Sequence, residues 1–340
     1  MVTLASEVIG FFRTRRAFVD VLDRHEERLL SGRWRLFTSG LCIHEHQQPP
    51  EHLRASRMNG DSSRRLYRWL PRVKVRAVGA GERSVTAVVM SRTGGEPETL
   101  LFDWVNGVVH RVGVKNLVDP AFVERLELLG RHLPLAPFSI DDDVLSMKMI
   151  EGVALGMLPG PEKDARIIEL IGYLSELARD SRTPDEASSA DRPSKAREAA
   201  AYLATLDTRR LDHVPQLRCR PDDLSEVFGQ SPWMPSHGDM HEHNVLLHDG
   251  RLALIDYAGC RPDAFWVDAL RVIRRTAQRS FDDGRFDGAL NGLWRAAGAG
   301  DLDVGRYRNA LRAGQRLWAV QAVDDPVGLA ARKPKWSPID

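Results

Sequence analysis

The chain has 340 residues, 43% of them hydrophobic, and is therefore long enough to bury one or two sizeable cores. A formal net charge of +1 gives no electrostatic reason to expect a nucleic-acid partner. The cysteines (Cys42, Cys219 and Cys260) are too scattered for a disulfide framework, and no apolar run approaches the ~18 residues of a membrane span, so we expect a cytoplasmic protein without a membrane partner.

Residues 1–65 are expected to form an N-terminal extension that is partly helical. Apolar residues recur at helical spacing over residues 8–30, whereas residues 47–64 are polar, contain proline and are typical of a loop. The extension could cover the domain that follows or mediate dimerisation, so the sequence is compatible with a monomer and with a homodimer.

The next segment, residues 66–150, has a β-rich pattern with one helix. Strands are expected over residues 73–78, 84–91, 99–105, 108–112, 135–140 and 144–150. Gly94-Gly95 forms a glycine turn, and Asn106-Gly107 predicts a two-residue hairpin turn. Asp119-Pro120 supplies the N-cap and the first residue of the helix.

Residues 151–340 have a mainly helical pattern. Apolar residues follow i, i+3, i+4, i+7 spacing from Ile167 to Ala178, and helices return after Asp268. Residues 182–194 are rich in Ser, Asp, Pro and Arg and are typical of a loop. Within this part of the chain, residues 236–260 carry the polar side chains best suited to chemistry.

The stretch 236–260 predicts a loop followed by a β-hairpin. Two apolar runs flank the Asp249-Gly250 pair, which is a hairpin turn signal. The hairpin folds Asp256, at the end of its second strand, back beside Asn244, so that two oxygen-bearing side chains can hold a hard cation such as Mg²⁺. Asp239, on the loop before the hairpin, can then face an incoming hydroxyl group, as phosphoryl transfer requires.

Histidines crowd the same stretch and raise the alternative of a zinc site. A helix would bring His237 and His241 onto one face, one turn apart. Gly238-Asp239 is poor helix-forming sequence, which argues against that geometry. An oxygen-ligated metal is therefore favoured over a histidine-ligated one.

The order of these residues resembles the catalytic segment of aminoglycoside phosphotransferases and choline kinase-like proteins, a family of small-molecule kinases. The resemblance rests on His237-Gly238-Asp239, on Asn244 and on Leu254-Ile255-Asp256-Tyr257. It implies that Asp239 is the catalytic base and that Asn244 and Asp256 bind Mg²⁺. It also implies that His237 braces the loop and that Asp268 ties the loop to the following helix.

The resemblance implies the fold class as well. We expect an α+β, two-lobed protein-kinase-like fold with a small β-rich N-lobe over residues 66–150. A larger, mainly helical C-lobe over residues 151–340 would carry the catalytic loop. The extension over residues 1–65 lies outside the family pattern.

The kinase-like layout assigns ATP binding to residues of the β-rich segment. Gly94-Gly95 would lie over the phosphates, with Gly79-Ala80-Gly81 as a competing candidate. Backbone groups of Lys148, Met149 and Ile150 would meet the adenine. ATP is the expected donor, and GTP is an alternative donor.

The strand that supplies a phosphate-binding lysine in such kinases has none in this chain. His110 and Arg111 are adjacent on it, and because neighbouring strand residues point to opposite faces, only one of them can serve. Arg111 is favoured, since a guanidinium is charged at any working pH and can bind two phosphate oxygens at once. An exposed strand arginine without a ligand is the alternative. Glu124 or Glu127, on the next helix, would be the acid that pairs with this cation.

The predicted function is ATP- and Mg²⁺-dependent phosphorylation of a hydroxyl group on a small molecule. Antibiotics, sugars, nucleosides and related metabolites are the candidate acceptors, and antibiotic resistance and metabolite tailoring are the candidate roles. Arg271, Arg274 and Arg275 recur at helical spacing and favour a neutral or anionic acceptor, with a solvated basic helix face as the alternative. The missing strand lysine leaves one competing function, a catalytically impaired nucleotide-binding pseudokinase.

Overall fold

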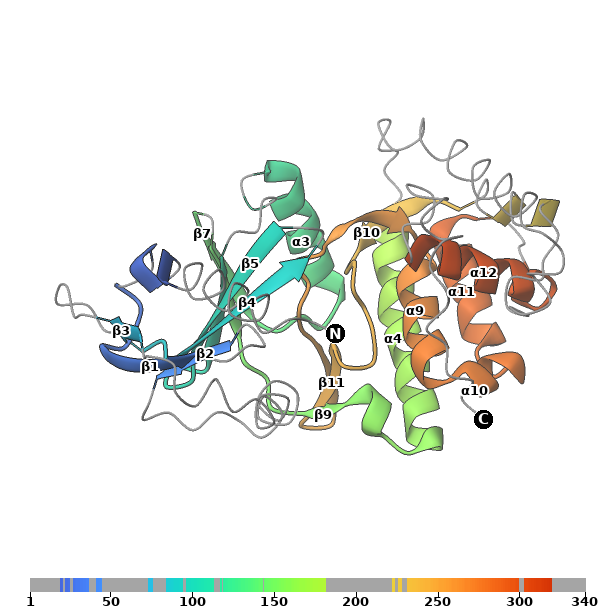
Figure 1. Ribbon diagram of the computed structural model, residues 1–340. Helices are drawn as coiled ribbons and strands as arrows, with labels where there is room; N and C mark the ends of the chain where they lie inside the picture. Colours follow the sequence, from blue (N-terminus) through green and yellow to red (C-terminus); the bar gives the residue numbers. More distant parts are fainter. Residues whose placement is uncertain are drawn as a thin grey trace, which may run out of the picture. The chain divides into compact units, whose positions relative to one another are not determined.

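The structure is a computed structural model with two compact units (Figure 1). The first comprises Met1–Pro120 and Ala136–Met149, and the second comprises Ala121–Leu135 and Ile150–Asp340. The residues that it describes are 19–20, 22–24, 27–36, 41–44, 73–75, 84–93, 96–112, 117, 119–142, 144–181, 222–223, 226–227, 231–299 and 303–319. Among the helices within these ranges, none combines the length and the apolar character needed to cross a membrane.

The first unit is built on an eight-stranded antiparallel sheet, in the order β3-β1-β2-β4-β5-β6-β8-β7. Its strands are β1 (Gly32–Leu36), β2 (Leu41–His44), β3 (Val73–Val75), β4 (Ala87–Thr93), β5 (Glu96–Asp103), β6 (Val108–Val112), β7 (Phe138–Asp141) and β8 (Val144–Lys148). β1 and β2 come from the segment expected to be an extension (Figure 1). β2 pairs with β4, and β1 pairs with β2 on its other side. Part of residues 1–65 is therefore integral to the sheet.

The two faces of this sheet differ in what they carry. Leu101 pairs with His110, so both side chains lie on one face. Leu101 belongs to a buried cluster that includes Leu22, Leu29, Trp34, Cys42, Val85, Val88, Val112 and Val144. Leu100 pairs with Arg111, and these two lie on the opposite face. The register of β5 and β6 thus separates His110 from Arg111.

The loop between β5 and β6 is longer than the two-residue turn predicted at Asn106-Gly107, and that prediction is wrong. The last strand pair joins Asp103 to Val108, so the loop comprises residues 104–107. The Asp103 carboxylate accepts hydrogen bonds from the Asn106 backbone N–H at 2.9 Å and from the Asn106 side-chain amide at 2.7 Å. These hydrogen bonds from the Asp103 side chain stabilise a four-residue loop in place of the two-residue turn.

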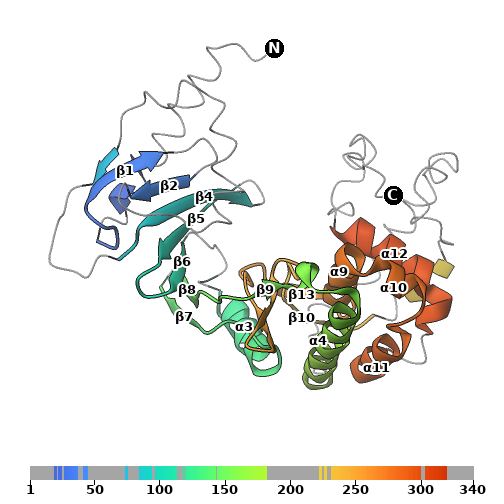
Figure 2. The same cartoon turned by 90° about the horizontal axis from the view of Figure 1, so that it is seen from below.

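The second unit is mainly helical, which together with the sheet gives the α+β class expected from the sequence. Its helices are α3 (Pro120–His132), α4 (Gly160–Asp180), α9 (Val267–Thr276), α10 (Gln278–Asp282), α11 (Asp287–Ala297) and α12 (Val304–Ala319), with the 3-10 helix η5 (Leu155–Met157). Small sheets join β9 (Val153–Ala154), β11 (Val245–His248) and β12 (Arg251–Leu254), and β10 (Trp233–Ser236) with β13 (Arg261–Ala264). α4 packs against α9 and α11, as Figures 1 and 2 show.

Helix α3 groups with the helical unit, although the sequence placed it in the β-rich segment. The Leu254 N–H at the end of β12 donates to the Pro134 carbonyl at 2.8 Å, just after α3. His132, in the last turn of α3, lies 2.9 Å from the carboxylate of Asp180 at the end of α4. These contacts fasten α3 to elements of the second unit.

Candidate active site

The predicted hairpin forms between β11 and β12 and brings Asp256 towards Asn244, which confirms the local fold expected for this stretch. Its strands pair in antiparallel register, and the Ile255 N–H donates to the Asn244 carbonyl at 3.0 Å. The ladder therefore continues to the residue just before Asp256. The Asp249-Gly250 turn has positive φ at both positions, 48° and 74°, as in a type I′ hairpin.

His237 is buried and begins the loop over residues 237–244 between β10 and β11, called the catalytic loop after its predicted role. Its backbone N–H donates to Asp268 Oδ2 at 2.7 Å, and its Nε2 lies 3.0 Å from the Ile255 carbonyl. The Asp239 N–H points to its Nδ1 at 3.4 Å, so Nδ1 accepts and Nε2 carries the proton. Burial lowers the pKa of His237, against the carboxylates of Asp268 and Asp256, and the ring stays neutral at pH 7.

Gly238 is a position in the loop where the neighbouring backbone leaves no room for a side chain. Its φ is +82°, and a Cβ placed there would lie 1.8 Å from the carbonyl oxygen of Gly259. Its N–H donates to Ser236 Oγ at 3.0 Å. Ser236 and Gly259 were not singled out in the sequence, because no local pattern reveals a backbone approach between segments about 20 residues apart.

The Asp239 side chain is 55% exposed and surrounded by positive or proton-donating groups. His241 Nε2 lies 3.5 Å from its Oδ2, and Arg271 Nη1 lies 4.0 Å from its Oδ1. The hydrogen bond from His241 is the largest cause that lowers the pKa of Asp239, and the charge of Arg271 acts in the same direction, against partial burial. The carboxylate is therefore ionised at pH 7 and able to accept a proton.

Asn244 and Asp256 offer oxygen atoms suited to a hard cation. The Asn244 side-chain nitrogen donates to the Asp239 carbonyl at 2.9 Å, so Oδ1 is the atom of this buried amide that can ligate a metal. Asp256 has a φ of 61°, in the left-handed region that aspartate enters more readily than most non-glycine residues. Two such ligands suit Mg²⁺, which keeps waters and substrate phosphates in its remaining positions.

A histidine-rich metal site finds no counterpart in the part of the chain that the structure describes. Within these ranges no group of three or more His, Cys, Asp or Glu side chains is placed to hold a metal ion. His243 is exposed, and its backbone N–H donates to His241 Nδ1 at 3.2 Å. Metal binding by Asn244 and Asp256 stays a prediction.

Helix α9 places the three arginines singled out in the sequence near the catalytic loop. Arg271 is buried, and its Nη1 donates to the carbonyl of the residue that precedes Asp239. Arg275 Nη1 lies 3.9 Å from Glu242 Oε1. Burial, followed by the charges of Arg275 and Arg271, lowers the pKa of Arg274, and Glu242 acts in the opposite direction. Glu242, which no sequence pattern singled out, is thus part of this charged group.

Arg111 lies on β6 in the first unit and is only 8% exposed. It shares its sheet face with Leu100 and with Leu145, its partner on β8. His110 lies on the opposite face, with its Nδ1 2.8 Å from Ser146 Oγ, and burial lowers its pKa. Arg111 is therefore not the exposed strand arginine of the alternative interpretation, and its contact with phosphate stays a prediction.

The residues assigned to adenine lie at the boundary between the units, which falls between Met149 and Ile150. The Lys148 N–H donates to the Pro137 carbonyl at 2.8 Å, and the Met149 N–H donates to the Gly107 carbonyl at 2.7 Å. Both donors are thus engaged within the first unit, so an adenine ring would have to use carbonyl groups or the Ile150 backbone. Gly94 and Gly95 lie outside the described residues.

The helix acids proposed to pair with the strand cation are both exposed. Phe122, Leu126 and Leu129 form the buried stripe of α3, and Glu124 and Glu127 fall on the side away from it. The pairing of either glutamate with the strand cation of the first unit stays a prediction.

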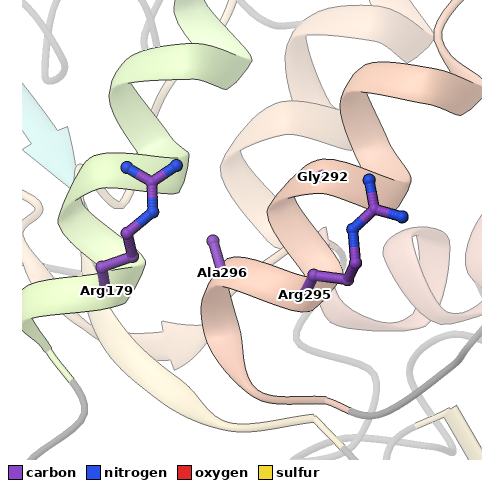
Figure 3. Close-up of a pocket in the computed structure, with 4 residues that line it drawn as sticks. All are labelled: Arg179, Gly292, Arg295 and Ala296. Atoms are coloured by element: carbon purple, nitrogen blue, oxygen red, sulfur yellow. The ribbon is translucent and has the colours of Figure 1, made fainter.

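Away from the catalytic loop, a cavity of about 480 Å³ opens between α4 and α11 (Figure 3). Its lining residues are Arg179, Gly292, Arg295 and Ala296. Figure 3 shows the two arginines on separate helices, and none of the residues assigned to catalysis or metal binding contributes to the lining. The cavity is therefore distinct from the site built by the loop.

The sequence matches one family model, that of the phosphotransferase enzyme family, over residues 89–306. This span is more than half of the chain and includes Arg111, the whole catalytic loop and α9. None of the curated proteins compared with the chain matches it significantly.

Several solved structures are similar to the chain at low identity. An aminoglycoside phosphotransferase from Streptomyces rimosus is 14% identical with a TM-score of 0.39, over 67% of this chain and 92% of that one. A spectinomycin phosphotransferase solved with ADP and spectinomycin is 10% identical with a TM-score of 0.43, over 74% and 85%. A choline/ethanolamine kinase family protein from Mesorhizobium loti is 16% identical with a TM-score of 0.35, over 70% and 81%. At these values the likenesses say nothing further about substrate.

Proposed function

The chain belongs to the phosphotransferase enzyme family, and from this premise we propose that it transfers the γ-phosphoryl group of ATP, with Mg²⁺, to a hydroxyl group of a small molecule. The observation that carries the proposal is the geometry of one loop and one hairpin. The ionised Asp239 is held by backbone contacts on both sides, and Asn244 and Asp256 are brought together by the β11–β12 ladder.

In the proposed reaction the acceptor oxygen bonds to the γ-phosphorus while the bond between that phosphorus and the β–γ bridging oxygen breaks. Asp239 takes the proton of the acceptor hydroxyl, and ADP leaves. Arg271, 4.0 Å from Asp239, keeps this carboxylate ionised and oriented before the proton arrives. Asn244 and Asp256 would hold Mg²⁺, which neutralises phosphate charge when bound.

His237 and Asp268 are proposed to position the loop rather than to touch the reacting atoms. The neutral imidazole joins the Asp239 backbone to the Ile255 carbonyl at the base of the hairpin. Asp268, in the first turn of α9, holds the backbone N–H of His237. The loop is therefore pinned at once to the hairpin and to the helix.

Replacement of Asp239 by asparagine tests the proposal directly. The amide cannot accept the hydroxyl proton, so acceptor-dependent ADP release should fall by about 10²- to 10⁴-fold. Asp249→Asn is the matched control, because Asp249 lies in the exposed hairpin turn, and its rate should stay within about twofold. Unchanged acceptor-dependent turnover in Asp239→Asn would exclude this residue as the base.

A pseudokinase is the competing function, and the absence of a lysine on the β6 strand is the observation that favours it. It predicts binding of Mg²⁺-ATP, seen as a thermal shift, without ADP release for any acceptor in a broad hydroxyl-metabolite library. The enzyme predicts both the thermal shift and acceptor-dependent ADP release. The library screen with the wild-type protein therefore separates the two.

A further inference from the structure

The arginines of α9 outnumber the acids that they meet on the catalytic loop. Arg271 faces Asp239 at 4.0 Å, and Arg275 faces Glu242 at 3.9 Å. For Arg274, no acid at ion-pair distance is found among the residues that the structure describes. Arg271 and Arg275 therefore each have an acid within 4.0 Å, whereas Arg274 has the more distant charge of Glu242.

Within the part of the chain that the structure describes, Arg274 also lacks hydrogen bonds to neutral groups at its buried Nε. Its side chain is partly buried, and its Nε is fully buried without a hydrogen-bond partner among the described residues. A guanidinium remains charged at any working pH, and a desolvated cation without a partner is costly. The neighbouring charges of Arg275 and Arg271 add repulsion, so an anion bound there would remove an existing cost.

Arg308, in the same unit, is an arginine whose side chain is occupied by contacts within the fold. Arg308 donates to the Phe281 carbonyl, to the Asp282 carbonyl at 2.7 Å and to both carboxylate oxygens of Asp287 at 2.8 and 2.6 Å. All of these partners belong to the fold itself. Arg274 lacks such a set, although it lies on a helix that faces the catalytic loop.

We propose that Arg274, assisted by Arg275, binds an acidic group of the acceptor substrate, either a carboxylate or a phosphate ester, while Asp239 receives the proton of the acceptor hydroxyl. This inference rests on the proposed function and narrows its substrate class. Residues three or four apart on a helix lie roughly 5–6 Å from each other at Cβ, so the acidic group lies about one helical turn from the Arg271 contact with the base. Small sugar acids and sugar phosphates carry a hydroxyl group and an acidic group in one molecule and belong to this class.

The charges next to Arg274 disfavour a polycationic acceptor. Those of Arg275 and Arg271 act on it first, and Glu242 opposes them. An ammonium group bound at Arg274 would therefore meet like charges, whereas an acidic group would meet opposite ones. Glu242 is the acid of this group: its Oε1 lies 3.9 Å from Arg275 and 3.7 Å from His243 Nε2, and its Oε2 is buried without a hydrogen-bond partner among the described residues. An amino sugar would add positive charge beside Arg274, on a helix that already carries three guanidiniums.

Matched acceptors test the inference on the wild-type protein. Glucose, glucuronic acid, glucose 1-phosphate and glucosamine share one ring and differ in charge, and ADP release with Mg²⁺-ATP is measured for each, followed by further acid and neutral pairs from a metabolite library. We expect the acidic members of the pairs to have the higher kcat/KM. A preference for the carboxylate or for the phosphate ester identifies which acid the site takes.

Variants of Arg274 test whether the preference for acidic acceptors comes from this residue. Arg274→Gln should raise KM for the acidic acceptor about 10- to 100-fold, the size expected for losing hydrogen bonds to a charged group, and should leave kcat and the neutral acceptor nearly unchanged. Arg274→Lys should recover part of the loss. Arg279→Gln, on the exposed surface of α10, is the matched control and should behave as wild type.

Two outcomes would overturn the inference while the proposed function stands. One is equal or better turnover of the neutral or amino member of every pair. The other is an equal loss for acidic and neutral acceptors in Arg274→Gln. Should no acceptor release ADP, the proposed function fails, and calorimetric binding of glucuronic acid and glucose 1-phosphate decides the inference separately. Binding that Arg274→Gln abolishes and Arg279→Gln retains supports it, and no binding refutes it.

Discussion

The catalytic loop and the Arg111 strand hold their functional side chains in different ways. In the loop, contacts between residues close in the sequence set the geometry, as when the Asn244 amide donates to the Asp239 carbonyl at 2.9 Å. On the strand, the face of Arg111 follows from its pairing with Leu100 and Leu145, which come from separate strands. The spacing of nearby residues is visible in the sequence as a motif, whereas the register between separate strands is not.

Gly238→Ala is expected to have the largest effect, because it breaks the loop at its tightest contact. A Cβ at this position would lie 1.8 Å from the Gly259 carbonyl oxygen, at a φ of +82°, so the backbone must move. Displacement of Asp239 by about 1 Å should lower kcat/KM about 10²-fold or more, with a lower melting temperature. Steady-state kinetics and thermal unfolding measure the two effects.

Gly250→Ala is the control for that prediction. Gly250 also has positive φ, 74°, but a Cβ at this position would meet nothing within 4 Å, so only backbone strain of about 1–2 kcal/mol is expected. Activity should therefore persist at temperatures where the variant is folded. Equal loss of activity in both variants would show that the crowding at Gly238 is not what matters.

Arg111→Gln tests the predicted role of β6 and should have an intermediate effect on activity. If the guanidinium binds ATP phosphates, its loss should raise KM for ATP about tenfold, with a smaller change in KM for the acceptor. His110→Gln, on the opposite face of β6, should change KM for ATP by less than about twofold. A larger effect of His110→Gln than of Arg111→Gln would show that the phosphate contact belongs to His110 instead.

His241→Leu, which has no side-chain donor, should have the smallest effect, a shift in pH dependence. His241 is the largest cause that lowers the pKa of Asp239, so its removal lets that pKa rise towards the ordinary value of an aspartate. A carboxylate with a depressed pKa in the folded state stabilises the fold above its unfolded pKa and loses that contribution on acidification. The acid limb of the kcat/KM profile should therefore move to higher pH, and a profile that does not move would assign the depressed pKa to Arg271.

The parts of the fold that could be predicted are those encoded locally. The β11–β12 hairpin follows from two apolar runs around Asp249-Gly250, and the buried face of α4 follows from helical spacing from Ile167 onwards. The loop between β5 and β6 could not be predicted as it is, because the Asp103 side chain competes with the expected turn. The two strands contributed by residues 1–65 were also missed, since β2 joins the sheet by pairing with β4 and β1 pairs with β3, both far away in the sequence.

The sequence by itself determined the local fold that carries Asp239, Asn244 and Asp256, because a loop and a hairpin suffice to bring these residues together. Tertiary structure alone decided which atoms surround them. It closed Gly238 against Gly259, joined His237 to Asp268 and brought the arginines of α9 to the loop. These contacts connect segments that no periodicity relates, and they form only when burial of the apolar faces fixes the helices and hairpin against one another.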